Sequence, residues 1–207
     1  MKLKEHLLPR LKTALQKEGD FRPELSTINA SPLNQGQTDY DFVFFKNESI
    51  YQHKVIRFNF TTYDIRRGVD FVKPDGPRCN IMLLADRTDN PNSHPFLYAR
   101  VLGAYHANVI YTGPGMRNYA ARSFDFLWVR WYTVVDSTSG WKSSTLDTVR
   151  FPPMHEDTSF GFVDPCDVLR GCHIIPAFGK GKRKERNANV SRCAEDTKDY
   201  LLYFVGR

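Results

Sequence analysis

The sequence lacks several features that would place it at once in a broad class of proteins. No run of about 18 apolar residues occurs, which argues against a transmembrane helix. The opening stretch, MKLKEHLLPRLK, mixes charged residues with leucines and contains no apolar signal-peptide core. Cysteine is scarce, with four residues in 207. We therefore expect an intracellular, non-membrane protein whose cysteines are thiols in a reducing compartment.

The middle of the chain also lacks an excess of charge of either sign. The net charge is +6, but residues 31–177 carry fifteen basic and fifteen acidic side chains. Residues 1–30 carry six basic and four acidic groups, and residues 178–207 carry eight and four. Because the middle is neutral, an electrostatic attraction to nucleic acid would have to come mainly from the C-terminal part.

Aromatic and β-branched residues are plentiful, and from Tyr40 onward they form short runs that are typical of strands. The runs are FVFF, KVIRFNFTTY, NIMLLA, FLYARVLGAYHANVIY and FLWVRWYTVV. Between them lie the turn-forming stretches KPDGP, DRTDNPNSHP, TGPGMRN and DSTSG. This alternation predicts a mainly β fold, either a small barrel or a sandwich.

A helix is predicted at the N-terminus, with Gly19 as its natural end. Its apolar residues recur at helical spacing, namely Leu3, Leu7, Leu8, Leu11, Ala14 and Leu15. Pro9 leaves the start open, because an interior proline costs a helix about 3 kcal/mol and the helix could instead begin there. The predicted order is a helix over 1–19, a linker over 20–39, a β domain over 40–178, a basic flexible loop over 179–199, and a strand or helix over 200–207.

The stretch FLWVRWY has aromatic side chains on both faces if it is a strand. Leu127, Val129 and Trp131 would share a core face, and Phe126, Trp128, Arg130 and Tyr132 the opposite one. Packing against another layer is the more common role for such a second face. The alternative is a ligand-binding aromatic face able to hold a cationic group, made of Tyr98, Trp128, Arg130, Trp131, Tyr132 and Trp141. An arginine on a sealed face needs a buried partner, so we expect Trp128 to be partly exposed beside Arg130.

The stretch GKGKRKER, residues 179–186, holds five basic residues in eight. Such a run is typical of a nuclear localisation signal or of an arm that contacts phosphates, and the alternative is a solvated loop. The candidate nucleic-acid-binding residues are Lys180, Lys182, Arg183, Lys184 and Arg186.

The sequence shows little sign of catalytic or metal-binding chemistry. Cys166, Cys172, His173 and Cys193 could form a zinc set, but the C-x5-C-H spacing is unusual and adjacent Cys and His cannot easily bind one ion. GCHIIPAF resembles a stretch of HNH-type nucleases, yet no histidine follows His173. There is no phosphate loop or nucleophile elbow. We expect no catalytic residues, no metal and no cofactor.

Three blocks, HPFLYARVLGAY (94–105), FLWVRWYTV (126–134) and FVDPCDVLRGCHIIP (162–176), resemble the order of signals in bromo-adjacent homology (BAH) domains. The matching residues are Tyr98, Ala99, Arg100, Val101, Val129, Trp131, Tyr132, Val168, Gly171, Cys172 and Ile174. The usual E-L-F element between the last two blocks is replaced by TVRFPPM. The resemblance implies a small BAH-like β-barrel and a chromatin module whose ligand is a histone tail or DNA. It also implies that Trp131 is the best single candidate for the ligand site.

A broader likeness covers most of residues 40–205. It is to an uncharacterised fungal family that accompanies Plavaka-type DNA transposons, in which the chain continues beyond the segment matching DYLLYFVGR. We therefore expect a shortened copy of such a protein. The combined prediction is a non-catalytic nuclear module that binds chromatin or DNA and derives from a mobile element. The alternatives are a transposon-associated nucleic-acid-processing accessory or degenerate HNH-like nuclease, and a protein–protein interaction domain.

Overall fold

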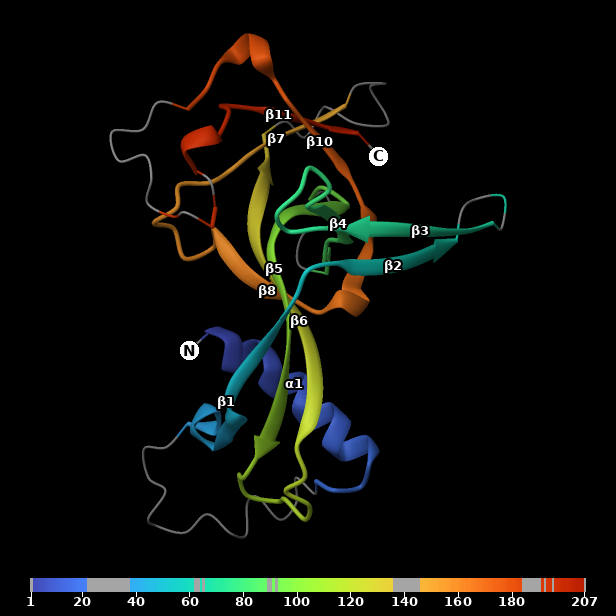
Figure 1. Ribbon diagram of the computed structural model, residues 1–207, viewed down its shortest axis with the longest axis vertical. Coiled ribbons are helices and arrows are strands. Elements are labelled where there is room, and N and C mark those ends of the chain that lie inside the picture. Colours follow the sequence, from blue (N-terminus) through green and yellow to red (C-terminus); the bar gives the residue numbers. More distant parts are fainter. Residues whose placement is uncertain are drawn as a thin grey trace. The chain divides into compact units, whose positions relative to one another are not determined.

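The computed structural model describes residues 2–21, 38–61, 64, 66–88, 91, 93–135, 146–183, 191, 193–194 and 196–206. Over these residues the protein is mainly β, with one α-helix near the N-terminus (Figure 1). The chain divides into two compact units: unit 1 comprises 1–52 and 105–126, and unit 2 comprises 53–104 and 127–207. None of the helices in the described part of the chain has the length and apolar character needed to cross a membrane.

The two longest strands are divided between the units: residues 105–111 and 122–126 belong to unit 1, and the rest of both strands belongs to unit 2. The elements in chain order are α1 (Lys2–Lys17), η2 (Asp39–Phe42), β1 (Val43–His53), β2 (Ile56–Thr61), β3 (Arg67–Val72), β4 (Asn80–Leu84), β5 (Phe96–Tyr111), β6 (Arg122–Val134), β7 (Asp147–Arg150), β8 (Phe160–Val163), η4 (Pro165–Asp167), β9 (Val168–Gly171), β10 (His173–Pro176), η5 (Phe178–Lys180), η6 (Asp196–Lys198) and β11 (Tyr203–Gly206).

Helix α1 confirms the predicted N-terminal helix, but it begins at Lys2 and encloses Pro9, so a start at Pro9 is wrong. Burial of one helical face offsets the hydrogen bond that proline cannot donate; the buried residues are Leu7, Leu8, Leu11 and Leu15. The helix ends before Gly19, whose φ of +74° is the left-handed conformation that glycine adopts readily after a helix.

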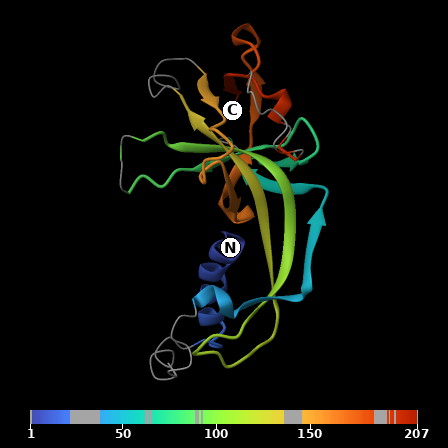
Figure 2. The ribbon, with the colours of Figure 1, turned by 90° about the vertical axis from the view of Figure 1, so that its left-hand side faces the viewer.

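Unit 1 combines this helix with β1 and with residues 105–111 of β5 and 122–126 of β6. Figure 2 shows α1 alongside these strands. Cations of α1 lie over aromatic rings of the strands: Lys12 over Tyr111, and Arg10 over Phe124. Arg122 of β6 pairs with Glu18 at 2.6 Å and with Asp20, which fixes the end of the helix to the strand.

The large sheet has the strand order β10-β11-β7-β6-β5-β4-β9, with β1 also paired to β5 and β8 to β6. As far as the described strands go, this order has two ends and does not close into a barrel. Strands β2 and β3 form a separate antiparallel hairpin (Figure 1). The predicted strand or helix over 200–207 is a strand, β11, which pairs with β10 and β7.

The core of unit 2 lies on both sides of β6. Leu127 and Val129 belong to one apolar cluster, against which Trp131 packs. Tyr132 belongs to a second cluster with Tyr98 and other residues. The predicted alternation along FLWVRWY is therefore confirmed, and the face opposite Leu127 is covered as well.

Candidate functional site

The residues proposed as an aromatic ligand surface differ in where they lie. Tyr98, Arg130 and Tyr132 are buried, with Arg130 only 1% exposed. Trp128 and Trp131 are half-buried, and Trp141 lies outside the described residues. Trp128 is partly exposed, as expected, whereas Arg130 on the same face is buried and does not reach water.

Arg130 is buried because it has an acidic partner far along the chain. Its Nη1 atom lies 2.7 Å from Oδ2 of Asp199, which is itself buried. The guanidinium also lies over the ring of Phe151, 3.8 Å from the ring centre. Arg100 stacks over the same ring at 4.7 Å and lies 3.8 Å from the Asp199 carboxylate. Burial raises the pKa of the Asp199 carboxyl, and the Arg130 guanidinium opposes that rise.

The two buried tyrosines also have structural partners. The Tyr98 hydroxyl donates to Oδ2 of Asp147 at 2.6 Å, and the Tyr132 hydroxyl donates to Oδ1 of Asn80 at 3.1 Å. Tyr132 stacks on Phe151, with the ring centres 4.1 Å apart. Burial raises the pKa of Tyr132 well above its usual range, so this hydroxyl stays protonated and acts as a donor. These tyrosines belong to the core of unit 2.

The two described tryptophans retain some exposed surface. Trp131 lies across the backbone of β8, where a β-carbon added to Gly161 would be 2.6 Å from the indole Nε1. Trp128 lies beside Phe160, with the ring centres 6.2 Å apart. Their role in ligand binding stays a prediction.

The basic run begins on an anchored segment. The Arg183 amide donates to the Asp199 carbonyl at 2.9 Å, and its Nη1 donates to the Phe151 carbonyl at 3.0 Å. Lys182 forms a β-bridge with Tyr200. The side chains of Lys180 and Lys182 are exposed, and that of Arg183 is half-buried. Lys184 and Arg186 lie outside the described residues.

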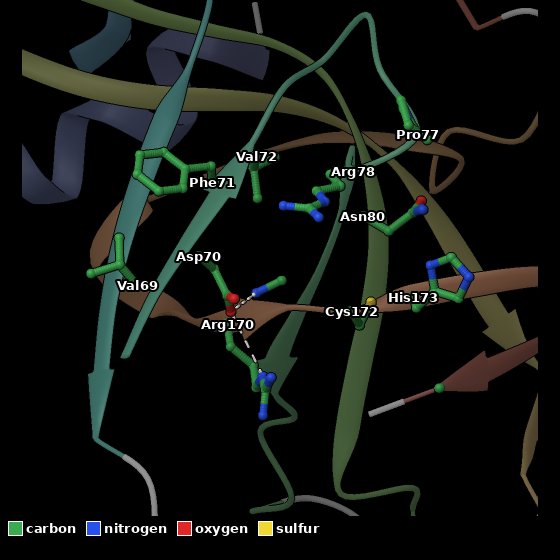
Figure 3. Close-up of a pocket in the computed structure, with 12 residues that line it drawn as sticks. Val69, Asp70, Phe71, Val72, Pro77, Arg78, Asn80, Arg170, Cys172 and His173 are labelled. Carbon is green, nitrogen blue, oxygen red and sulfur yellow. Dashed lines mark hydrogen bonds and ion pairs between the residues drawn. The ribbon is translucent and has the colours of Figure 1, made fainter. Parts of the chain in front are cut away.

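A groove that the sequence did not indicate lies beside β3 in unit 2 (Figure 3). It has a volume of about 480 Å³, and we call it the β3 groove. Its lining residues are Val69, Asp70, Phe71, Val72, Pro77, Arg78, Asn80, Arg170, Gly171, Cys172, His173 and Gly206. Four successive residues of β3 line it. Successive side chains of a strand point to opposite faces, so the groove follows the edge of β3 rather than one of its faces.

Positive charge exceeds negative charge along the β3 groove. Its one acidic residue, Asp70, accepts a hydrogen bond from the Gly171 amide at 3.0 Å and lies 3.7 Å from Nε of Arg170. Arg170 in turn stacks on Phe60, 4.8 Å from the ring centre. Arg78 is exposed, and Figure 3 shows its guanidinium turned into the space beside Val72. Within the described part of the chain, no carboxylate is paired with Arg78.

The groove contains one thiol, and burial determines its chemistry. Burial raises the pKa of Cys172 to about 12, so at neutral pH the side chain is a protonated thiol and a poor nucleophile or metal ligand.

We expect iodoacetamide at about pH 8 to label Cys172 at least about tenfold more slowly than the exposed Cys193. Mass spectrometry of peptides from briefly labelled native protein measures both rates. Equal labelling of the two cysteines would show that burial does not suppress the reactivity of Cys172.

Sequence reasoning missed this groove because its walls come from separate segments. Asp70, Arg78 and Arg170 belong to β3, to the turn after it and to β9, and none of them forms a local motif. A weak signal was present in DFVKPDGPRCN, where apolar, turn-forming and basic residues alternate at short range.

No protein-family model, curated protein or solved structure matches the chain.

Proposed function

We propose that the protein is a non-catalytic nuclear module that binds DNA through the basic run of residues 179–186. The observation that carries this proposal is the exposure of Lys180 and Lys182 on the anchored start of that run. Residues 178–207 carry twice as many basic as acidic groups, while residues 31–177 are neutral. Basic side chains concentrated on one segment attract phosphates, whereas scattered charges cancel.

Of the two chromatin ligands that the BAH resemblance implies, DNA is the better match. A histone tail is basic and would be repelled by the run. A methyl-lysine cage requires open aromatic rings, whereas Tyr98 and Tyr132 are buried. A relation to BAH domains and an origin in a mobile element remain part of this proposal and rest on the sequence resemblance. Catalysis at His173 has less in its favour, because this histidine belongs to no group of described side chains placed to share a metal ion.

Replacing Lys180, Lys182, Arg183, Lys184 and Arg186 with alanine should remove most of the affinity for DNA. The slope of log affinity against log salt should decrease by about 0.9 for each phosphate that the variant no longer neutralises. Fluorescence anisotropy with a labelled DNA duplex at several salt concentrations measures both quantities.

The matched control removes the same net charge from exposed residues elsewhere, namely Lys46, Lys54, Arg87, Arg117 and Arg150. It should keep most of the affinity and of the salt slope. If the two variants lose affinity equally, the attraction belongs to the net charge of the protein and the basic run is not a site. Wild-type protein that fails to bind DNA at low salt would refute the proposal outright.

A further inference from the structure

We propose that the β3 groove binds an extended acidic segment of a partner protein, which adds to the edge of β3 as a third strand of the β2–β3 sheet. This binding function is separate from DNA binding by the basic run and uses different residues.

The edge of β3 that faces away from β2 is open to another strand. Strand β3 pairs with β2 in an antiparallel register from Arg67 to Val72, and within the described residues it has no neighbour on its other side. An edge strand presents backbone N–H and C=O groups that can pair with another chain. Proteins commonly use such an edge to bind an extended peptide, and the main chain then supplies the hydrogen bonds.

The surface along this edge of β3 is hollowed and partly apolar. Residues 170–173 line the groove together with residues 69–72 of β3, so the edge of β3 borders an open space. A second recess of about 550 Å³ continues past Phe71, Pro77 and Arg78 to Val55 and Lys73. Phe71 is 48% exposed, and Val69 and Val55 are similarly exposed. Edge strands that must not pair usually carry charges, and of the six residues of β3 only Arg67 and Asp70 are charged. An alternating peptide could place apolar side chains against Phe71, Val69 and Val55.

The charge of the groove determines the chemistry of the peptide. Arg78 and Lys73 are exposed on the turn that closes the groove, and Arg170 and His173 also line the groove. The only carboxylate in the lining, that of Asp70, already interacts with the Gly171 amide and with Arg170. An arginine such as Arg78 can bind a carboxylate through two parallel hydrogen bonds. A segment that alternates apolar residues with glutamate or aspartate therefore complements both the shape and the charge.

The probe for this proposal is a pool of fluorescein-labelled peptides of about ten residues, in which glutamate alternates with valine, isoleucine or phenylalanine. The protein should bind this pool saturably. It should bind a pool with lysine in place of glutamate at least about tenfold more weakly. Arg78→Glu should also weaken binding by about tenfold or more, because it replaces an attraction with a repulsion. The control Arg87→Glu makes the same charge change at an exposed position outside the groove and should have little effect.

Backbone pairing is tested with methylated peptides. A strand bonds to its neighbour on one side through the amides of alternate residues. N-methylation of one alternate set should therefore abolish binding, and methylation of the other set should be tolerated far better. Equal effects of the two sets would overturn strand addition, as would unchanged binding by Arg78→Glu. Failure to saturate at peptide concentrations on the order of 1 mM would overturn the proposal entirely.

Two other occupants would give different results. If a DNA duplex displaces the peptide and Arg78→Glu loses affinity for DNA, the groove is a DNA contact and the peptide proposal is wrong. If the protein is a dimer that Arg78→Glu dissociates, as sedimentation would show, a second copy fills the groove and the proposal is again wrong. The five-alanine variant of the basic run should keep its peptide affinity, so failure of either proposal leaves the other testable.

Discussion

Asp199→Ala should lower the free energy of unfolding by about 3–5 kcal/mol, because it leaves the Arg130 guanidinium buried without a carboxylate. Both side chains are almost wholly inaccessible, and 2.7 Å separates their charged atoms. The stacked ring of Phe151 compensates for only part of the lost attraction. Urea unfolding followed by tryptophan fluorescence measures the change.

The matched control is Asp167→Ala, which removes a carboxylate from an exposed position in the same unit. It should change the stability by no more than about 0.5 kcal/mol. The double variant Arg130→Met with Asp199→Leu should recover part of the stability, because Arg130 is no longer buried without a partner, whereas Arg100 still loses its interaction with Asp199. If Asp199→Ala costs less than about 1 kcal/mol, the guanidinium has another partner or reaches water, and the ion pair is not what keeps it buried.

Elements with a strong local pattern could be predicted from the sequence. The leucines of α1 recur at helical spacing, and the alternation of Leu127, Val129 and Trp131 gave the correct core face of β6. The helical spacing and the strand alternation both depend only on residues a few positions apart. The start of α1 could not be predicted in the same way. The cost of Pro9 is local, whereas the burial that offsets it depends on strands distant in the sequence.

The environment of Arg130 could not be predicted, because its partner lies in a stretch that is polar and basic. Asp199 directly follows the short helix η6, and nothing local distinguishes it from the solvated aspartates of the chain. An arginine on a sealed face requires a buried partner, and this requirement follows from the sequence alone. The return of β11 to the sheet, where it pairs with β7 and β10 and brings the C-terminal segment with it, does not. Long-range pairing of this kind decides which charged residues are buried.

The β3 groove, like the environment of Arg130, could be predicted only in part from the sequence. The KPDGP stretch predicts a turn after β3, and the structure has one there, with the Lys73 amide bonded to the Arg78 carbonyl at 2.9 Å. The groove is also lined by residues 170–173, far along the chain. No spacing rule connects Arg78 to Arg170, because the two meet only through the contact between the β2–β3 hairpin and β9. Sequence motifs therefore identified the basic run, whereas the groove required the fold.

Leu127→Ala should destabilise the protein by about 2–5 kcal/mol, because it leaves a cavity where β6 meets the rest of its apolar cluster. Leu127 is 1% exposed and pairs in register with Val163 of β8. Its neighbours Val101 and Val129 are also fully buried, so the surrounding core has little freedom to collapse into the space.

The comparison is Leu84→Ala on β4, where the side chain is 63% exposed and the same truncation should cost less than about 1 kcal/mol. Chemical denaturation of both variants measures the difference. If the two variants are destabilised equally, Leu127 is not a core residue, and the cluster on that face of β6 does not hold unit 2 together.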